Sequence, residues 1–291
     1  MADYSEEFIK ADNPWKSEDN FVCPIPEKLY DDKAKWLLKC DEEIVSQFNL
    51  KNPNNDYKYE LGMRPEPFNG NPLKAKVIIL SLNPGYVLRV NNLFAKVLQT
   101  TEPKDIQDAV KEQKDKQLRL EAESFFCQRN RINDELVSYR EAHCMLDDWY
   151  WYDILSKFLN EANKYGLLKD FTLDRIFDSF ALVQYIGYMS KSFKAFPKGT
   201  ILPSQEFTKR LIEYLAENKP NVIFIVSRSV KEWNGLLGDK LWGRLEADKR
   251  LVTRKKFTDK NEVKRTIRTQ GFGKDTFEVG GYKRIIEALT K

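Results

Sequence analysis

The stretch AKVIILSLNPGY, residues 75–86, decides the fold. Its residues 77–80 form an unbroken apolar run, which is typical of a strand buried on both faces in the middle of a parallel sheet. Pro84 has no N–H to give to a strand ladder and Gly85 tolerates a positive φ, so the strand has to end in a turn there. Open α/β sheets place their ligand sites beyond the carboxyl ends of such strands. The stretch therefore predicts a central strand that leads directly into a polar turn at Asn83.

Further apolar runs predict the neighbours of this strand. FALVQYIGY (180–188) and NVIFIV (221–226) are expected to form two more buried strands, and Leu251 begins a last one. Apolar residues recur at helical spacing between the strands, and Ser204 is expected to cap one of the helices. The expected helices cover residues 27–48, 91–99, 147–165, 204–218, 230–237 and 280–289. This alternation predicts an α/β fold, a three-layer α/β/α sandwich with a mostly parallel central sheet.

No linker or internal repeat divides the chain, so we expect a single domain over residues 1–291. Residues 1–22 are mostly polar and are predicted to form a loose N-terminal arm. Residues 104–145 are highly charged and lack glycine and proline. They are therefore predicted to form a helical insertion with a mostly solvated surface.

The composition argues against a membrane or secreted protein. No apolar run approaches 18 residues and the N-terminus is acidic and polar, so neither a membrane span nor a signal peptide is expected. A cytoplasmic protein is the resulting prediction. The four cysteines contain no CxxC pair, which argues against a zinc ribbon and leaves two alternatives, reduced buried thiols or ligands of an iron–sulfur cluster. They are Cys23, Cys40, Cys127 and Cys144.

Common catalytic signatures are missing from the sequence. There is no GxGxxG or GxxxxGK loop for a nucleotide and no GxSxG elbow. The single histidine, His143, argues against a Ser-His-Asp triad and against a metal site with several histidine ligands. We therefore expect no cofactor and no metal.

The net charge of +4 is unevenly distributed. Residues 249–274 contain ten lysines and arginines against two acids, a segment charge of +8 that leaves −4 for the remainder. A basic segment on a nearly neutral body favours contact with a polyanion. A solvated surface loop is the alternative that charge alone leaves open.

Three polar turns, at residues 81–86, 185–192 and 227–229, follow the three main predicted strands. Because the carboxyl ends of parallel strands share one edge of a sheet, these turns are expected to line one site. Tyr86 and Tyr185 would offer ring faces to an extruded base, and the basic segment would contact a phosphate backbone. Ordinary packing in the core or at its rim is the alternative for each tyrosine.

The segment PEPFNGNPLKAKVIILSLNPGY (65–86) resembles the first motif of the uracil-DNA glycosylase superfamily. Members carry a Pro/Gly lead-in, a hydrophobic strand and a turn such as GQDPYH or GINPG, and SLNPGY is most similar to the mismatch-specific branch. ILPSQ (201–205) is similar to uncharacterised bacterial relatives, and the order of elements in residues 176–291 fits the family. The resemblance implies a uracil-DNA-glycosylase-like fold, with DNA and a flipped base as the partners. No membrane contact and no obligate protein partner are inferred.

The resemblance also implies roles for individual residues. Asn83 takes the position of the polar residue that aligns the attacking water. Gly85 stands where the uracil-specific branch has a tyrosine that blocks the pyrimidine 5-position, which implies a pocket open to thymine or a larger base. Gln184 or Tyr185 lies near the strand that supplies a reader of the base edge. The implied base pocket consists of Leu82, Pro84, Gly85, Tyr86, Gln184, Tyr185 and Ser190.

The family's second motif, usually His-Pro-Ser, is missing, since residues 251–278 contain neither histidine nor proline. The expected donors to the departing base anion or to DNA phosphates are instead Ser227, Arg228, Arg254 and Lys255, with backbone amides as the alternative for the base anion. No acid lies between Ser81 and Asn92. Because an amide can orient water but cannot accept its proton, the sequence predicts a slow enzyme, or one that relies on base flipping and anion stabilisation more than on water activation.

Three functional hypotheses remain at this point. The first is a DNA glycosylase that excises a mismatched, deaminated or 5-modified pyrimidine, including a modified base of viral DNA in phage defence. The second is a catalytically weak or inactive nucleic-acid-binding module with a glycosylase fold. The third is an unrelated α/β enzyme in which Asn-Pro-Gly is only a turn.

Overall fold

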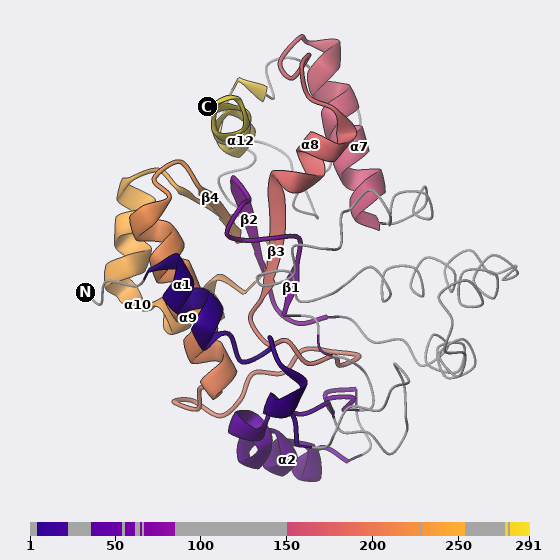
Figure 1. Ribbon diagram of the computed structural model, residues 1–291, viewed down its shortest axis with the longest axis vertical. Coiled ribbons are helices and arrows are strands. Elements are labelled where there is room, and N and C mark those ends of the chain that lie inside the picture. The colour runs from indigo at the N-terminus through magenta and orange to yellow at the C-terminus, as the bar shows by residue number, and fades with distance from the viewer. Residues whose placement is uncertain are drawn as a thin grey trace, which may run out of the picture.

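A computed structural model describes residues 5–22, 36–53, 56–61, 65, 67–84, 150–226, 229–253, 277–278 and 280–291. At its centre lies a five-stranded sheet in the order β1-β3-β2-β4-β5 (Figure 1). The neighbouring strands β3, β2, β4 and β5 are parallel, and β1 pairs with β3 in the antiparallel sense at the edge. The strands are β1 (Phe68–Asn69), β2 (Val77–Ser81), β3 (Phe180–Gln184), β4 (Ile223–Val226) and β5 (Leu251–Thr253). The predicted α/β class and its mostly parallel sheet are confirmed.

The central strand β2 is buried on both faces. Ile78 and Leu80 belong to one apolar core, whereas Val77 and Ile79 belong to a second core on the opposite face. Because successive side chains of a strand point to opposite faces, only an unbroken apolar run can fill both cores. The burial of β2 in two cores therefore explains why residues 77–80 are all apolar.

Helices cover both faces of the sheet (Figure 1). One core includes side chains of α2 (Glu42–Lys51), α9 (Pro203–Asn218) and α10 (Val230–Ala247), and α1 (Glu6–Asp12) packs against α9. The other core includes side chains of α7 (Tyr150–Lys164), α8 (Leu173–Asp178) and α12 (Gly280–Thr290). None of the helices in the described ranges is both long and apolar enough to cross a membrane.

Most predicted elements are present in the described ranges. The expected helices over 147–165, 204–218 and 280–289 are α7, α9 and α12. The helix expected over 230–237 continues to Ala247, with a kink at Gly238, whose φ of 77° and ψ of 154° are not helical. The expected helix over 91–99 and the insertion over 104–145 lie outside the described residues.

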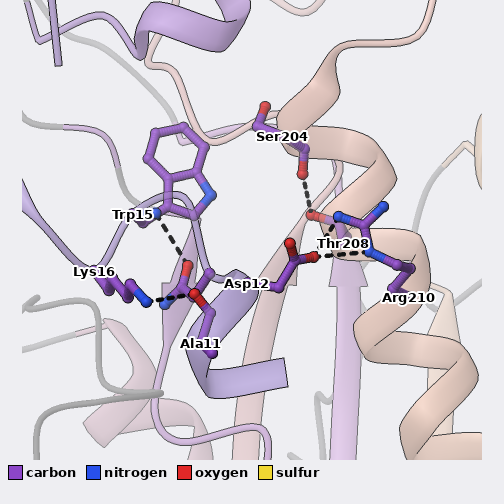
Figure 2. Close-up of polar contacts among 8 residues, drawn as sticks. Ala11, Asp12, Trp15, Lys16, Ser204, Thr208 and Arg210 are labelled. Carbon is purple, nitrogen blue, oxygen red and sulfur yellow. Dashed lines mark hydrogen bonds and ion pairs between the residues drawn. The ribbon is translucent and has the colours of Figure 1, made fainter. Parts of the chain in front are cut away.

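The prediction of a loose N-terminal arm is wrong for residues 5–22. Ser5 caps α1 by accepting a hydrogen bond from the Phe8 N–H, at 3.1 Å. Ile9, Trp15 and Phe21 are all buried in the core that α9 and α10 cover. Asp12 pairs with Arg210 of α9, whose Nε lies 2.9 Å from Oδ2 of Asp12 (Figure 2). Three buried apolar side chains and two ion pairs, Asp12–Arg210 and Glu6–Lys219, therefore attach a segment whose average composition is polar.

Two helix starts differ from the sequence expectation. Residues 36–38 are not helical: Phe21 and Leu38 form an antiparallel bridge, and a 3₁₀ turn (Lys39–Asp41) precedes α2. Ser204 is not the N-cap of α9, because the helix begins at Pro203 and the side chain of Gln205 accepts the Leu202 N–H at 2.8 Å.

The edge strand β1 lies in the Pro/Gly lead-in that precedes β2, where no strand is predicted from the sequence. Gly70, with φ of 81°, ends it, and a Cβ atom there would lie 2.6 Å from the carbonyl oxygen of Phe180. Only glycine permits this close approach to β3.

Arg250 joins α9 to the sheet. Its buried guanidinium donates hydrogen bonds to the carbonyl oxygens of Leu215, Ala216, Lys219 and Val222, at 2.6 to 3.2 Å. Three of these carbonyls belong to the carboxyl end of α9, where the helix dipole favours a positive charge. Burial lowers the pKa of Arg250 below its usual value, but guanidinium stays charged in proteins.

We expect Arg250→Met to lower the free energy of unfolding by about 3 kcal/mol, because four carbonyls lose a charged donor. Urea denaturation measures this difference. Arg244→Gln is the matched control, because Arg244 forms a partly exposed ion pair with Glu217 at 3.6 Å and should cost less than about 1 kcal/mol. Equal losses in the two variants would contradict the role assigned to Arg250.

Candidate active site at the carboxyl edge of the sheet

The turns after β2 and β3 meet at the carboxyl edge of the sheet. Ser81 and Gln184 are paired in register at the ends of the two strands. Beyond them the Tyr185 N–H donates to Ser81 O at 3.0 Å, and the Ile186 N–H donates to Leu82 O at 2.8 Å. The structure thus brings together the two groups of predicted site residues at 82–84 and 184–190.

The helix α10, which follows β4, also contacts this edge of the sheet. The indole Nε1 of Trp233, a fully buried residue, donates to Ser81 O at 3.0 Å. The chain leaves β2 toward β3 on one side and leaves β4 toward β5 on the other, so the direction of strand order changes at β2 and β4. Such a switch point is where open α/β sheets bind ligands.

The side-chain amide of Asn83 has one possible orientation. Its Nδ2 donates to Ser190 Oγ at 2.8 Å and to the carbonyl oxygen of Pro84 at 3.1 Å. A carbonyl oxygen can only accept, so the nitrogen must lie on this side and Oδ1 on the other. Within the described part of the chain no donor reaches Oδ1. Asn83 is only partly buried, so this acceptor is held in place and available.

Ser190 holds this orientation. Its hydroxyl accepts from Asn83 and donates to the Ser192 carbonyl at 2.9 Å, and its N–H donates to Pro84 O at 3.3 Å. Ser190 is buried, and both hydrogen-bonding functions of its hydroxyl are used. The residue predicted as a wall of the base pocket therefore supports Asn83.

Gln184 presents an unpaired acceptor at the same edge. Its side chain is 6% exposed, and its Oε1 has no hydrogen-bond partner among the described residues. A buried carbonyl without a donor costs about 1–3 kcal/mol, so a water molecule or a ligand N–H is the expected partner. The alternation along β3 places Gln184 on the same face of the sheet as Ser81.

Tyr185 points to the opposite face. Its ring makes edge contacts with Trp233, at a centroid distance of 5.4 Å, and with Phe193, at 6.1 Å. Burial raises the pKa of Tyr185, Glu232 raises it further, and the Gln205 amide opposes them. The phenol is thus a neutral hydroxyl on a ring held by aromatic packing, as the packing alternative predicts.

The remaining predicted site residues lie outside the described ranges: Gly85, Tyr86, Ser227, Arg228, Arg254 and Lys255. The same holds for His143 and for three of the four cysteines. Cys40 is a free thiol on an exposed residue, so it does not fit the alternative of buried thiols, and partial desolvation of the sulfur together with the adjacent Asp41 raises its pKa to about 12. Among the described residues no group of three His, Cys, Asp or Glu side chains could hold a metal ion.

A buried carboxylate that sequence reasoning missed anchors the loop carrying Ser190. Asp41 is fully buried and accepts from Tyr188 Oη at 2.8 Å and from the Ser204 N–H at 3.0 Å. Tyr188 Oη in turn accepts from the Leu38 N–H at 3.2 Å. Asp41 therefore ties the loop after β3 to the first turn of α9, where the helix dipole favours a negative charge.

Comparisons of the chain with models of protein families, with curated proteins and with solved structures found no match. What the structure defines by itself is an α/β protein with a fixed asparagine at the carboxyl edge of a mostly parallel sheet, beside a glutamine whose Oε1 has no partner among the described residues.

Asp41 predicts a specific dependence of stability on pH. Burial raises the pKa of Asp41 above its usual value despite the hydrogen bonds from Ser204 and Tyr188 that oppose it. The folded protein therefore binds the proton more tightly than the unfolded chain, and the contribution of Asp41 to stability falls as pH rises from about 4 through the raised pKa.

This dependence is measurable with Asp41→Asn. We expect the free energy of unfolding of the wild type, relative to Asp41→Asn, to decline between pH 4 and pH 7 in urea titrations. A difference that grows in favour of the wild type over this range would mean that the hydrogen bonds outweigh burial.

Proposed function

We propose that the protein is a DNA glycosylase of the uracil-DNA glycosylase superfamily, with that family's fold. It flips a mismatched, deaminated or 5-modified pyrimidine out of DNA and hydrolyses its N-glycosidic bond, acting in the cytoplasm. The observation that carries the proposal is the fixed amide of Asn83, which presents Oδ1 at the carboxyl end of the central strand. This is the position that the SLNPGY motif assigns to the residue that aligns water.

The chemistry requires a water molecule to be aligned with the sugar carbon. Cleaving the C–N bond builds positive charge on the sugar and negative charge on the base, so the transition state resembles an oxocarbenium ion. Oδ1 of Asn83 accepts a hydrogen bond from the attacking water and turns a lone pair of that water toward C1′. An amide cannot take the water proton, so bond cleavage has to run ahead of water attack, and the proton then passes to the departed base anion or to solvent.

Gln184 supplies a reader for the base edge. Its unpaired Oε1 can accept from an N–H group, which uracil and thymine present at N3 and cytosine at its amino group. A base that donates a hydrogen bond to Oε1 removes the free-energy cost of a buried, unpaired acceptor. The hydrogen bond to Gln184 would therefore favour binding of a flipped pyrimidine.

Three further features of the proposal come from the sequence. Gly85 leaves room for a substituent at the pyrimidine 5-position, which extends the substrate range to bulky modified bases of viral DNA and to phage defence. Ser227 and Arg228 stabilise the departing base anion in place of the missing His-Pro-Ser motif. Arg254 and Lys255 contact DNA phosphates.

The first experiment tests base excision directly. The protein is incubated with duplexes that contain uracil, a G·T mismatch, 5-hydroxymethylcytosine or glucosylated hydroxymethylcytosine, and abasic sites are cleaved with alkali. We expect strand breaks with at least one duplex and a loss of about 100-fold in kcat in Asn83→Ala. Salt-sensitive DNA binding without abasic sites would favour the binding-module alternative. If the protein neither binds nor cleaves DNA, the hypothesis of an unrelated α/β enzyme remains.

A second variant tests whether Ser190 positions Asn83. Ser190→Ala removes the acceptor of the Asn83 amide without touching Oδ1, so we expect kcat to fall on the order of tenfold while KM changes little. Ser192→Ala is the matched control, because only the backbone of Ser192 takes part in this chain of hydrogen bonds. An equal effect in both variants would argue against a positioning role.

A further inference from the structure

A cavity of about 490 Å³ lies at the amino edge of the sheet, opposite Asn83. It opens between α12 and the connections that lead into β4 and β5. Its volume falls within the range of sites for small molecules. The lining residues of chemical interest are Ile223, Lys249, Arg250, Lys283, Arg284 and Ala288.

The charges around this cavity favour an anion. Five cationic side chains line it against two acidic ones, Asp248 and Glu287. Glu287 lies 4.0 Å from Lys283, and with both acids counted against the five cations the side chains of the lining keep a net charge of +3. Within the described residues, Arg284 donates one hydrogen bond, from Nη1 to Leu251 O at 3.3 Å.

The buried guanidinium of Arg250 offsets the negative potential that the carboxyl end of α9 would otherwise create beside the cavity. The carboxyl end of α9 reaches this edge and would present unpaired carbonyl oxygens there. Arg250 occupies those carbonyls with its guanidinium. The first residue of α12, Gly280, also lines the cavity, and the amino end of a helix adds positive potential.

Lys249 occupies a conformation that normally selects glycine. Its φ is 57°, at the turn between α10 and β5, and its side chain lines the cavity. Left-handed backbone conformations are unfavourable for residues with a Cβ atom, and glycine is the usual choice after a helix. A charged side chain kept in such a conformation indicates a use for the charge.

We propose that this cavity binds a small phosphorylated organic anion of about the size of a nucleoside monophosphate. The phosphate contacts Lys249, Lys283 and Arg284, and the organic part lies on the apolar surface of Ile223, Pro220 and Ala288. The site is separate from Asn83, because β4 and β5 begin at this edge of the sheet and end at the other.

Calorimetric titration of the full chain with adenosine 5′-monophosphate tests the proposal at constant ionic strength. We expect saturable binding that is tighter than that of inorganic phosphate, and none for adenosine. Lys249→Gly suits the left-handed backbone and so keeps the fold, yet the double variant Lys249→Gly, Lys283→Gln should bind at least tenfold more weakly. Lys240→Gln, an exposed lysine of α10 outside the cavity, is the matched control and should bind like the wild type.

Asn83→Ala should also retain wild-type affinity for the nucleotide, whatever its effect on DNA. A lack of saturable binding at millimolar nucleotide would overturn the proposal. So would unchanged affinity in a folded double variant, or a loss in Asn83→Ala that places the nucleotide at the other edge.

Discussion

Burial of β2 on both faces is the constraint on which the rest of the structure depends. A strand that fills two cores needs helices above and below it, and α9 and α10 on one face and α7 and α12 on the other supply them. It also needs a neighbour on each side, and the parallel strands β3 and β4 occupy these places. Beyond the carboxyl end of β2, Pro84 has no N–H for strand pairing, so the chain turns there. A polar turn is therefore delivered to the edge where the neighbouring turns also arrive.

The sequence predicts this frame because its signals are local. Unbroken apolar runs mark β2 and β4, and helical spacing marks α7, α9 and α12. The errors occur where the deciding partner is distant in the chain. Ser204 lies inside α9 and not at its N-cap, and its N–H donates to Asp41, a partner 163 residues away that the sequence does not reveal. The polar composition of residues 5–22 hides the few side chains that anchor them.

At the candidate site, too, the sequence predicts features set by neighbouring residues and misses those set by residues far apart in the chain. The sequence identifies Asn83 and its place at the edge, but the orientation of its amide depends on Ser190, which is 107 residues away. The sequence leaves Gln184 and Tyr185 as equal candidates for reading a base. The structure separates them, since adjacent strand residues face opposite sides and only Gln184 keeps an unpaired acceptor. We therefore propose that water alignment by Asn83 and base reading by Gln184 are two functions of one sheet edge.

The central proposal is that Oδ1 of Asn83 faces the sugar of a flipped pyrimidine nucleotide. A crystal structure of the protein with a duplex containing 2′-fluoro-2′-deoxyuridine tests it most directly, because the fluorine disfavours positive charge on the sugar and slows cleavage. We expect the base to lie at the carboxyl edge, with Oδ1 within hydrogen-bonding distance of a water near C1′ and Oε1 of Gln184 near N3 of uracil. A duplex bound elsewhere, or an Asn83 amide turned so that Nδ2 faces the sugar, would contradict the proposal.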